Sequence, residues 1–342
     1  MAPRPRTRRL TRTLLAVLVT ASVAVPVSGA ARPAAVPAPA PTALGPLRDT
    51  TPTALARRYA TTRADIRAAE RAADAHGDHR RAAALHAMAD PGRHFLTFDG
   101  RDGGRSTEVY GDLAHADRIA VLVPGSDTGL DTYQRLRDGA RALQQQLRRE
   151  PGGHSAVLAW LGYPTPATFG PAALTTARAD DAAPELIDFT RQLRSADPTA
   201  RIALLCHSYG SVVCGRAAPD LPATDLVLYG SPGVGADTAA DLHTRATVWA
   251  GRAAGDWIGH VPHAQLPLPT TTLGFGTDPV SPGFGARIFP AGDGGHSDYL
   301  KPGTLSLENL ARITAGRPPV AAPHGTTPDR TAAAPQREAR RG

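Results

Sequence analysis

The sequence predicts an α/β fold in which helices cover both faces of a mostly parallel sheet opened by an antiparallel hairpin. From residue 118 to 315, short apolar runs alternate with helical patterns. This alternation is typical of parallel strands joined by crossover helices. Before it, two strand-like runs at 94–98 and 105–110 flank the Gly-rich stretch 99–104, a pattern that indicates a β-hairpin.

The later elements each have a local signal. The run 118–123 is apolar and ends at Pro124-Gly125, which indicates a buried parallel strand. The helical pattern 180–196 is closed by Asp197-Pro198, because the residue before a proline disfavours helix. Further strands are expected at 155–161, 201–205, 225–229, 246–250 and 286–289, and further helices at 130–149, 209–217 and 305–315.

The N-terminus has the pattern of a secretory signal peptide over residues 1–30. An Arg-rich stretch precedes the apolar run 14–27, and Ser28-Gly29-Ala30 supplies the small residues of a cleavage site. The apolar run is shorter than the ~20 residues that span a bilayer. We therefore expect a protein that is secreted or associated with the cell envelope, with no stable membrane insertion after cleavage. An uncleaved membrane anchor is the alternative.

The remaining chain divides into a main domain and three flanking segments. Residues 31–50 are rich in Ala and Pro, which predicts a stiff, extended linker. Residues 51–90 have a helical pattern with sparse apolar positions, so these helices are expected to pack on the outside of the main domain, 91–315. Residues 316–342 are rich in Pro, Ala and Arg, and a disordered tail is expected there.

Positive charge is concentrated at the two ends of the chain. The formal net charge is +7, which by itself would suggest a nucleic-acid partner. Residues 1–30 contain five Arg and no acidic residue, and residues 316–342 contribute a net +3. The remaining residues, 31–315, therefore have a net charge of −1. No nucleic-acid partner is expected.

The sequence predicts neither a metal site nor a cofactor. His76, His79 and His86 lie in the N-terminal helical segment, but no acidic or cysteine partner completes a ligand set. Surface positions are therefore expected for these histidines. Gly233-Val234-Gly235 and Gly274-Phe275-Gly276 lack the full glycine fingerprint of a dinucleotide site.

The chain has two cysteines, Cys206 and Cys214. Export permits a disulfide, but the expected structure places one cysteine at a strand end and the other about two helical turns further on. A disulfide needs Cα atoms within ~7 Å of each other. Two buried free thiols are therefore favoured over a disulfide, which stays open as the alternative.

Ser208 is the candidate nucleophile. The run 201–205 leads into Cys206-His207-Ser208-Tyr209-Gly210 and then into a helix, which is the strand–turn–helix context of a nucleophile elbow. The residues two before and two after the serine have to be small, because strand and helix pass close together there. Gly210 meets this need, and Cys206 is a small side chain where glycine is usual. An ordinary tight turn is the alternative interpretation.

A serine hydroxyl requires a base and an orienting carboxylate. On such a fold they follow in the order serine, acid, histidine, each after a later strand. Asp256 is the first carboxylate beyond a predicted strand, with Asp237 as its rival, and His296 lies in a Gly-rich loop after the last strand. His260 and His263 compete as bases, but they follow Asp256 too closely to be delivered by a strand of their own. We expect His296 to transfer the proton and Asp256 to fix its tautomer.

Two backbone N–H groups are expected to form an oxyanion hole. One belongs to Tyr209, at the positive end of the helix that follows the nucleophile. The other comes from the loop 123–128 after the first parallel strand, where Ser126 is the candidate donor and Gly125 the alternative. An ordinary turn is the competing interpretation.

Four motifs occur in order within residues 93–312: Val121–Gly125, Cys206–Ser211, Val248-Trp249 followed by Gly255–Ile258, and Gly295–Tyr299. In these motifs the chain resembles an actinobacterial family of secreted α/β-hydrolases of unknown function. The resemblance implies an α/β-hydrolase fold and a serine-hydrolase triad at Ser208, Asp256 and His296. It supplies no substrate.

The sequence therefore predicts a secreted serine hydrolase that cleaves a carboxylic ester, rather than an amide or peptide, in a small-molecule or acyl substrate. The alternative is a catalytically silent, envelope-associated binding protein, which would need none of the three triad residues. Segments 162–179 and 259–285 are expected to shape the site, because they follow strands at its edge. The candidate lining residues, each of which could instead pack the loops down, are Tyr163, Phe169, Trp257, Phe275 and Phe284.

Overall fold

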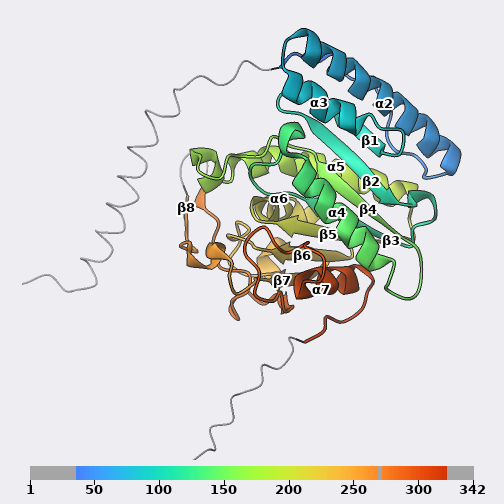
Figure 1. Cartoon of the computed structure of the whole chain (residues 1–342). Coiled ribbons are helices and arrows are strands. Elements are labelled where there is room, and N and C mark those ends of the chain that lie inside the picture. The colour runs from blue at the N-terminus through green and yellow to red at the C-terminus, as the bar shows by residue number, and fades with distance from the viewer. Residues whose placement is uncertain (1–35, 268–271, 322–342) are drawn as a thin grey trace, which may run out of the picture.

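A mixed sheet of eight strands runs through the protein (Figure 1). The computed structural model describes residues 36–267 and 272–321. The strands lie side by side in the order β1-β2-β4-β3-β5-β6-β7-β10. Their bounds are His94–Asp99 (β1), Arg105–Gly111 (β2), Arg118–Val123 (β3), Ser155–Leu161 (β4), Arg201–His207 (β5), Asp225–Tyr229 (β6), Thr247–Gly251 (β7) and Arg287–Ile288 (β10).

The sheet combines an antiparallel beginning with a parallel body. β1 and β2 form the hairpin, and β2 pairs with β4 in antiparallel orientation. From β4 onward every neighbouring pair is parallel. A second, two-stranded sheet consists of β8 (Gln265–Pro267) and β9 (Thr272–Gly274). The predicted fold class is confirmed, and the C-terminal ends of the parallel strands lie at one edge of the main sheet.

Helices cover both faces of this sheet (Figure 1). α4 (Gln134–Leu147) and α7 (Leu305–Thr314) lie on one face, and α5 (Ala177–Ala196) and α6 (Tyr209–Ala217) lie on the other. The predicted N-terminal helices are α2 (Pro52–Ala75) and α3 (His79–Met88), and α2 packs on β1. None of the helices in the described residues is both long and apolar enough to cross a bilayer.

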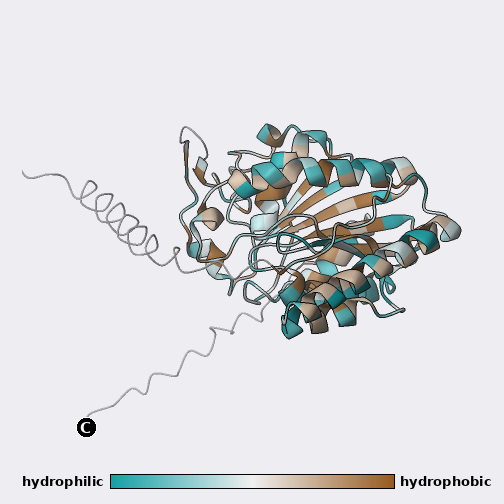
Figure 2. Cartoon of the chain, turned by 90° about the horizontal axis from the view of Figure 1, so that it is seen from above, coloured by the Kyte–Doolittle hydropathy of each residue, from teal (hydrophilic) through white to brown (hydrophobic). Residues whose placement is uncertain are grey.

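The alternation of side chains along a strand explains the two cores. In β3, Ile119 and Val121 point toward α5 and α6, while Ala120 and Leu122 point toward α4 and α7. Successive side chains of a strand point to opposite faces, so a strand covered on both faces has to be apolar throughout. Figure 2 shows these apolar strands between helices whose outer faces are hydrophilic. The sheet therefore holds the loops at its edge on a rigid support.

The segment that follows the predicted signal peptide lies against the main domain. Residues 36–50 contain no helix or strand, but Leu47 is buried and its N–H donates to Gln192 Oε1 of α5 at 2.9 Å. The part of the predicted linker that the structure describes is thus packed on the body. The predicted signal peptide, residues 1–30, lies outside the described residues.

The start of the predicted tail is also fixed to the body. The N–H of Val320 donates to Asn309 Oδ1 of α7 at 2.8 Å, and Asn309 Nδ2 donates back to the Val320 carbonyl at 3.2 Å. These reciprocal bonds hold residues 316–321 in place, so the expectation of disorder does not hold for them. The remainder of that segment, 322–342, lies outside the described residues.

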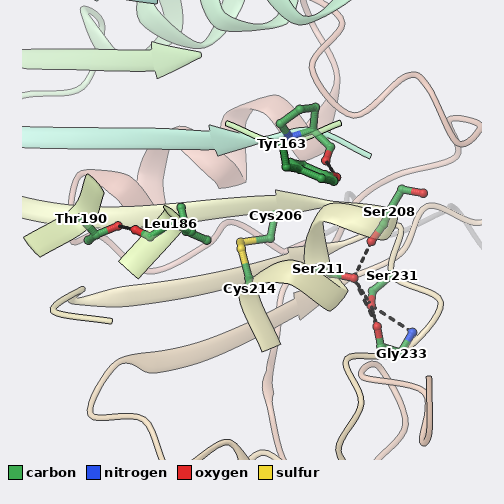
Figure 3. Close-up of a disulfide and its surroundings, with 10 residues drawn as sticks. Tyr163, Leu186, Thr190, Cys206, Ser208, Ser211, Cys214, Ser231 and Gly233 are labelled. Carbon is green, nitrogen blue, oxygen red and sulfur yellow. Dashed lines mark hydrogen bonds between the residues drawn. A yellow bond between two sulfur atoms is a disulfide. The ribbon is translucent and has the colours of Figure 1, made fainter. Parts of the chain in front are cut away.

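The prediction of two free thiols is wrong, because Cys206 and Cys214 form a disulfide (Figure 3). Their Cα atoms are 6.4 Å apart, which is within the range that a disulfide bridges. The separation along the helix does not decide the distance between the two cysteines, because it leaves out the direction in which the helix runs. After the sharp turn at Ser208, α6 runs back along β5 and brings position 214 beside position 206.

Removal of this disulfide is expected to destabilise the fold. For the variant Cys206→Ala/Cys214→Ala, the free energy of unfolding should fall by roughly 2–3 kcal/mol, because the unfolded chain regains the freedom of the closed loop. Urea unfolding followed by circular dichroism measures the change. A double variant that unfolds at the same urea concentration as the wild type would contradict the prediction.

Candidate active site

The turn between β5 and α6 presents Ser208 above the edge of the sheet. Ser208 has a φ of +52°, a strained conformation for a residue with a side chain. Two backbone hydrogen bonds hold the turn, from the Ser208 N–H to the Tyr229 carbonyl at 3.1 Å and from the Ser211 N–H to the Ser208 carbonyl at 2.9 Å. A Cβ at position 210 would lie 2.5 Å from the Val123 carbonyl oxygen, so only glycine fits there.

The structure brings Ser208, His296 and Asp256 together from three separate loops. His296 Nε2 lies 2.9 Å from Ser208 Oγ, and His296 Nδ1 lies 2.8 and 3.0 Å from the two carboxylate oxygens of Asp256. Asp256 is 2% exposed and Ser208 9%. The arrangement lets the imidazole accept the hydroxyl proton at one nitrogen while the other nitrogen stays bonded to a buried carboxylate.

The rival residues lie elsewhere. Asp237 is exposed and its carboxylate accepts a hydrogen bond from Thr277 at 3.3 Å. His260 Nδ1 faces the Trp257 carbonyl at 3.3 Å, and His263 Nδ1 faces the Pro232 carbonyl at 3.1 Å. The geometry thus separates these residues from the group around Ser208.

Tyr299 is a second partner of the acid that sequence reasoning missed. Its hydroxyl donates to Asp256 Oδ2 at 2.6 Å and accepts from the Ala253 N–H at 3.1 Å. Burial by itself would raise the pKa of the Asp256 carboxyl, but the hydrogen bonds from His296, Tyr299 and the Ile258 N–H outweigh it and hold that pKa below its ordinary value. A signal for Tyr299 was present in the Gly295–Tyr299 motif, which contains a tyrosine three residues after the histidine.

His207 ties the loop that holds the candidate base to the nucleophile turn. Its Nε2 lies 2.8 Å from the carbonyl oxygen of His296. Because a carbonyl only accepts, this nitrogen carries the proton. Burial and the neighbouring imidazole of His296 lower the pKa of His207 to about 3, so the ring stays neutral at ordinary pH. Sequence reasoning missed this role, since nothing in the local pattern shows what the ring contacts.

The loop after β3 packs directly on the nucleophile. A Cβ on Gly125 would lie 2.6 Å from Ser208 Cβ and 3.1 Å from Ser208 Oγ, so the Gly125 backbone lies against the serine. Tyr163 holds this loop, because its hydroxyl donates to the Pro124 carbonyl at 2.7 Å. The oxyanion donors proposed from sequence, the N–H groups of Tyr209 and of Ser126 or Gly125, flank Ser208 along the chain and in this loop. Their role stays a prediction.

The five aromatic residues expected to line the site fall into two groups. Tyr163, Phe275 and Phe284 are buried in the core and fasten the surrounding loops. Phe169 is 99% exposed and Trp257 49% exposed. Only the exposed pair is therefore free to contact a ligand.

His76, His79 and His86 are exposed, as expected, and the last two face acidic side chains at the surface. His79 pairs with Asp74 at 3.1 Å and His86 with Glu70 at 2.8 Å. Within residues 36–267 and 272–321, no group of three or more His, Cys, Asp or Glu side chains is arranged to hold a metal ion.

An eight-stranded, mostly parallel sheet with a serine at the β5–α6 turn defines the α/β-hydrolase fold. A family model described as alpha/beta hydrolase matches residues 99–266. An uncharacterized protein of Mycobacterium bovis is 30% identical over 186 residues, which cover 49% of this chain and 70% of that protein. The chain belongs to this α/β-hydrolase family.

Other similar proteins differ in length or are more distant in sequence. An uncharacterized protein of Mycobacterium tuberculosis is 30% identical over 253 residues, or 65% of this chain, and the match spans only 38% of that relative. A solved α/β serine hydrolase of Xanthomonas campestris, described as lacking a lid, is 20% identical with a TM-score of 0.42. That match covers 68% of this chain and 97% of the solved one.

Proposed function

We propose that the protein is a secreted serine hydrolase that cleaves a carboxylic ester, with amides or peptides as less favoured substrates. One observation carries the proposal. The 2.9 Å contact from His296 Nε2 to Ser208 Oγ is combined with the contact of His296 Nδ1 to buried Asp256. A protein that only binds its ligand has no need to hold a strained serine against an imidazole oriented in this way.

The proposed reaction has two steps. In the first, His296 Nε2 takes the Ser208 hydroxyl proton while Oγ bonds to the ester carbonyl carbon, and the resulting imidazolium gives that proton to the departing alcohol. In the second, His296 takes a proton from water, the hydroxide oxygen attacks the acyl-enzyme, and Ser208 leaves with the proton returned to it. The N–H groups of Tyr209 and Ser126, or Gly125 in place of Ser126, would bind the negative oxygen in each step.

Secretion is supported by two features. Residues 1–30 have the sequence pattern of a signal peptide. The Cys206–Cys214 disulfide favours folding in an oxidising compartment, because thiols are kept reduced in the cytosol. We propose an extracellular or envelope-associated location and a small-molecule or acyl substrate, without a cofactor or a nucleic-acid partner.

The experiment is covalent labelling with a fluorophosphonate, which reacts with activated serines. We expect the wild-type protein to be labelled and the Ser208→Ala protein to remain unlabelled. Ser297→Ala is the matched control, because this serine is exposed and lies beside His296 in sequence. This variant should still be labelled. An unlabelled wild type would favour the silent binding protein, and a labelled Ser208→Ala protein would remove Ser208 from the mechanism.

A further inference from the structure

Most of the large apolar side chains that the structure exposes lie around the candidate site. In the described residues these exposed side chains are Phe169, Leu174, Trp257, Leu266 and Ile288. The first four lie on the segments that follow β4 and β7, at the C-terminal edge of the parallel strands, where Ser208 is also located. We call Phe169, Leu174, Trp257 and Leu266 the apolar rim.

Phe169 lies beside the loop that packs on the nucleophile. The N–H of Thr168 donates to Asp127 Oδ1 at 3.1 Å, and the Asp127 N–H donates to the Pro166 carbonyl at 3.0 Å. Asp127 is two residues beyond Gly125, which touches Ser208. The chain therefore holds a 99% exposed phenylalanine next to the proposed oxyanion hole.

Leu174 and Leu266 lie on neighbouring segments. Thr175, the neighbour of Leu174, accepts a hydrogen bond from the Tyr209 hydroxyl at 2.7 Å and forms a bridge to Leu273 of β9. Leu273 lies opposite Leu266 in the β8–β9 pair, and Figure 1 shows β8 beside the chain that follows β4. Both leucines are thus linked, through Thr175, to the residue that follows the nucleophile.

Trp257 lies against the candidate base. It directly follows Asp256, its ring centroid lies 4.8 Å from that of His296, and it is 49% exposed. An exposed apolar ring therefore lies next to the candidate base.

The segments that hold the apolar rim contain no charged side chain. Residues 162–177, 257–267 and 272–277 lack Asp, Glu, Lys and Arg, although 20% of the chain is charged. Several exposed apolar side chains on neighbouring uncharged segments favour an interaction site there. Contact with an anionic membrane would call for clustered Lys and Arg instead, so the chemistry fits an apolar surface without net charge.

We propose that the apolar rim docks the protein onto the surface of an uncharged lipid aggregate, such as a droplet of acylglycerol. The rim side chains would enter the lipid while Ser208 faces it, so that an ester leaves the aggregate directly into the site. The hydrolysis of that ester rests on the proposed function, but the docking does not. Docking places the protein on the lipid surface, and it does not restrict the length of the acyl chain in the ester that is cleaved.

The test measures docking without catalysis. Ser208→Ala protein is mixed with triolein droplets coated with phosphatidylcholine, a lipid without net charge, and the droplets are floated by centrifugation. We expect the protein to float with them equally well in dilute salt and in roughly 1 M salt, where the Debye length is only ~3 Å. Adding Phe169→Ser, Leu174→Ser and Leu266→Ser together should lower the partition coefficient by about a hundredfold, because three apolar side chains no longer leave water.

Ile288→Ser is the matched control. Ile288 is similarly exposed, at 52%, but lies on the edge strand β10 outside the rim segments, so its replacement should leave flotation unchanged. Thermal unfolding verifies that the variants fold, and if the triple variant does not, Phe169→Ser alone should weaken binding about tenfold. In addition, the fluorescence emission of Trp257 should shift to shorter wavelength on the droplets, and Trp257→Phe should abolish that shift.

The proposal would be overturned by flotation of the rim variant at the wild-type level, by an equal loss in Ile288→Ser, or by release of the protein in high salt. Retention on an insoluble polysaccharide in place of the droplets would assign the rim to a different partner and would also overturn it. Because flotation uses the Ser208→Ala protein, it can fail while fluorophosphonate labelling of the wild type succeeds, and the reverse also holds.

Discussion

Replacement of Ser208 with alanine is expected to lower kcat/KM for a soluble ester such as p-nitrophenyl butyrate by about 10⁶-fold, because the nucleophile is lost. His296→Ala should cost about as much, since the hydroxyl is not nucleophilic without the base at its Nε2 contact of 2.9 Å. The double variant should be no slower than either single one. Initial rates of p-nitrophenol release measure all three.

The non-additivity is the informative part of this experiment. If the two residues acted independently, the double variant would lose the product of the single effects, and the shared proton transfer would be excluded. A Ser208→Ala protein that keeps a tenth of the wild-type activity would mean that a different group attacks the ester. Circular dichroism of each variant separates lost chemistry from lost folding.

Asp256→Asn is expected to lower kcat by about 10⁴-fold while KM changes little. The amide retains the shape of the carboxylate, but its NH₂ group can donate to His296 Nδ1, so it does not fix the tautomer with the proton on that nitrogen. The uncharged amide also does not stabilise the imidazolium that forms during proton transfer. Tyr299→Phe provides a graded comparison. It removes the 2.6 Å hydrogen bond to Asp256 Oδ2 but leaves the carboxylate, so a reduction in kcat of roughly tenfold is expected.

The pH dependence follows from the direction of the Asp256 shift. Because the pKa of this carboxyl lies below the ordinary value of 3.8, Asp256 stays ionised to a lower pH than a free aspartate, and kcat/KM should keep the contribution of the carboxylate throughout the neutral range. The same shift stabilises the fold above the unfolded pKa of Asp256, and this stabilisation is lost as the pH falls through the lower, folded value. Equal kcat for Asp256→Asn and the wild type would contradict the assigned orienting role.

The sequence predicted the parts of the protein that local pattern controls. Apolar runs bounded by Gly and Pro located the strands, and the small residues around Ser208 located the turn after β5. In a parallel sheet the C-terminal ends of the strands meet at one edge. Residues after β5, after β7 and after the last strand were therefore expected to converge, and the structure places Ser208, Asp256 and His296 within hydrogen-bond distance.

The contacts that orient these groups could not be read from the sequence. His207 reaches the carbonyl of His296, 89 residues away, and Tyr299 reaches Asp256, 43 residues away. Each depends on how two distant loops meet, and a side chain's own neighbours in sequence do not reveal that. The Cys206–Cys214 disulfide escaped prediction for a related reason, since it depends on the direction in which α6 leaves the Ser208 turn.

By itself, then, the sequence determined the order of strands and helices and the identity of the three candidate reacting side chains, because periodicity and residue size act over a few residues at a time. Only the tertiary structure decided that the cysteines are joined, that Gly125 packs on Ser208, and that Phe169 and Trp257 stand in solvent while Tyr163, Phe275 and Phe284 are buried. Exposure and long-range contact are properties of the packed chain, and an aromatic residue in a loop has the same sequence signal whether it is buried or free to meet a ligand.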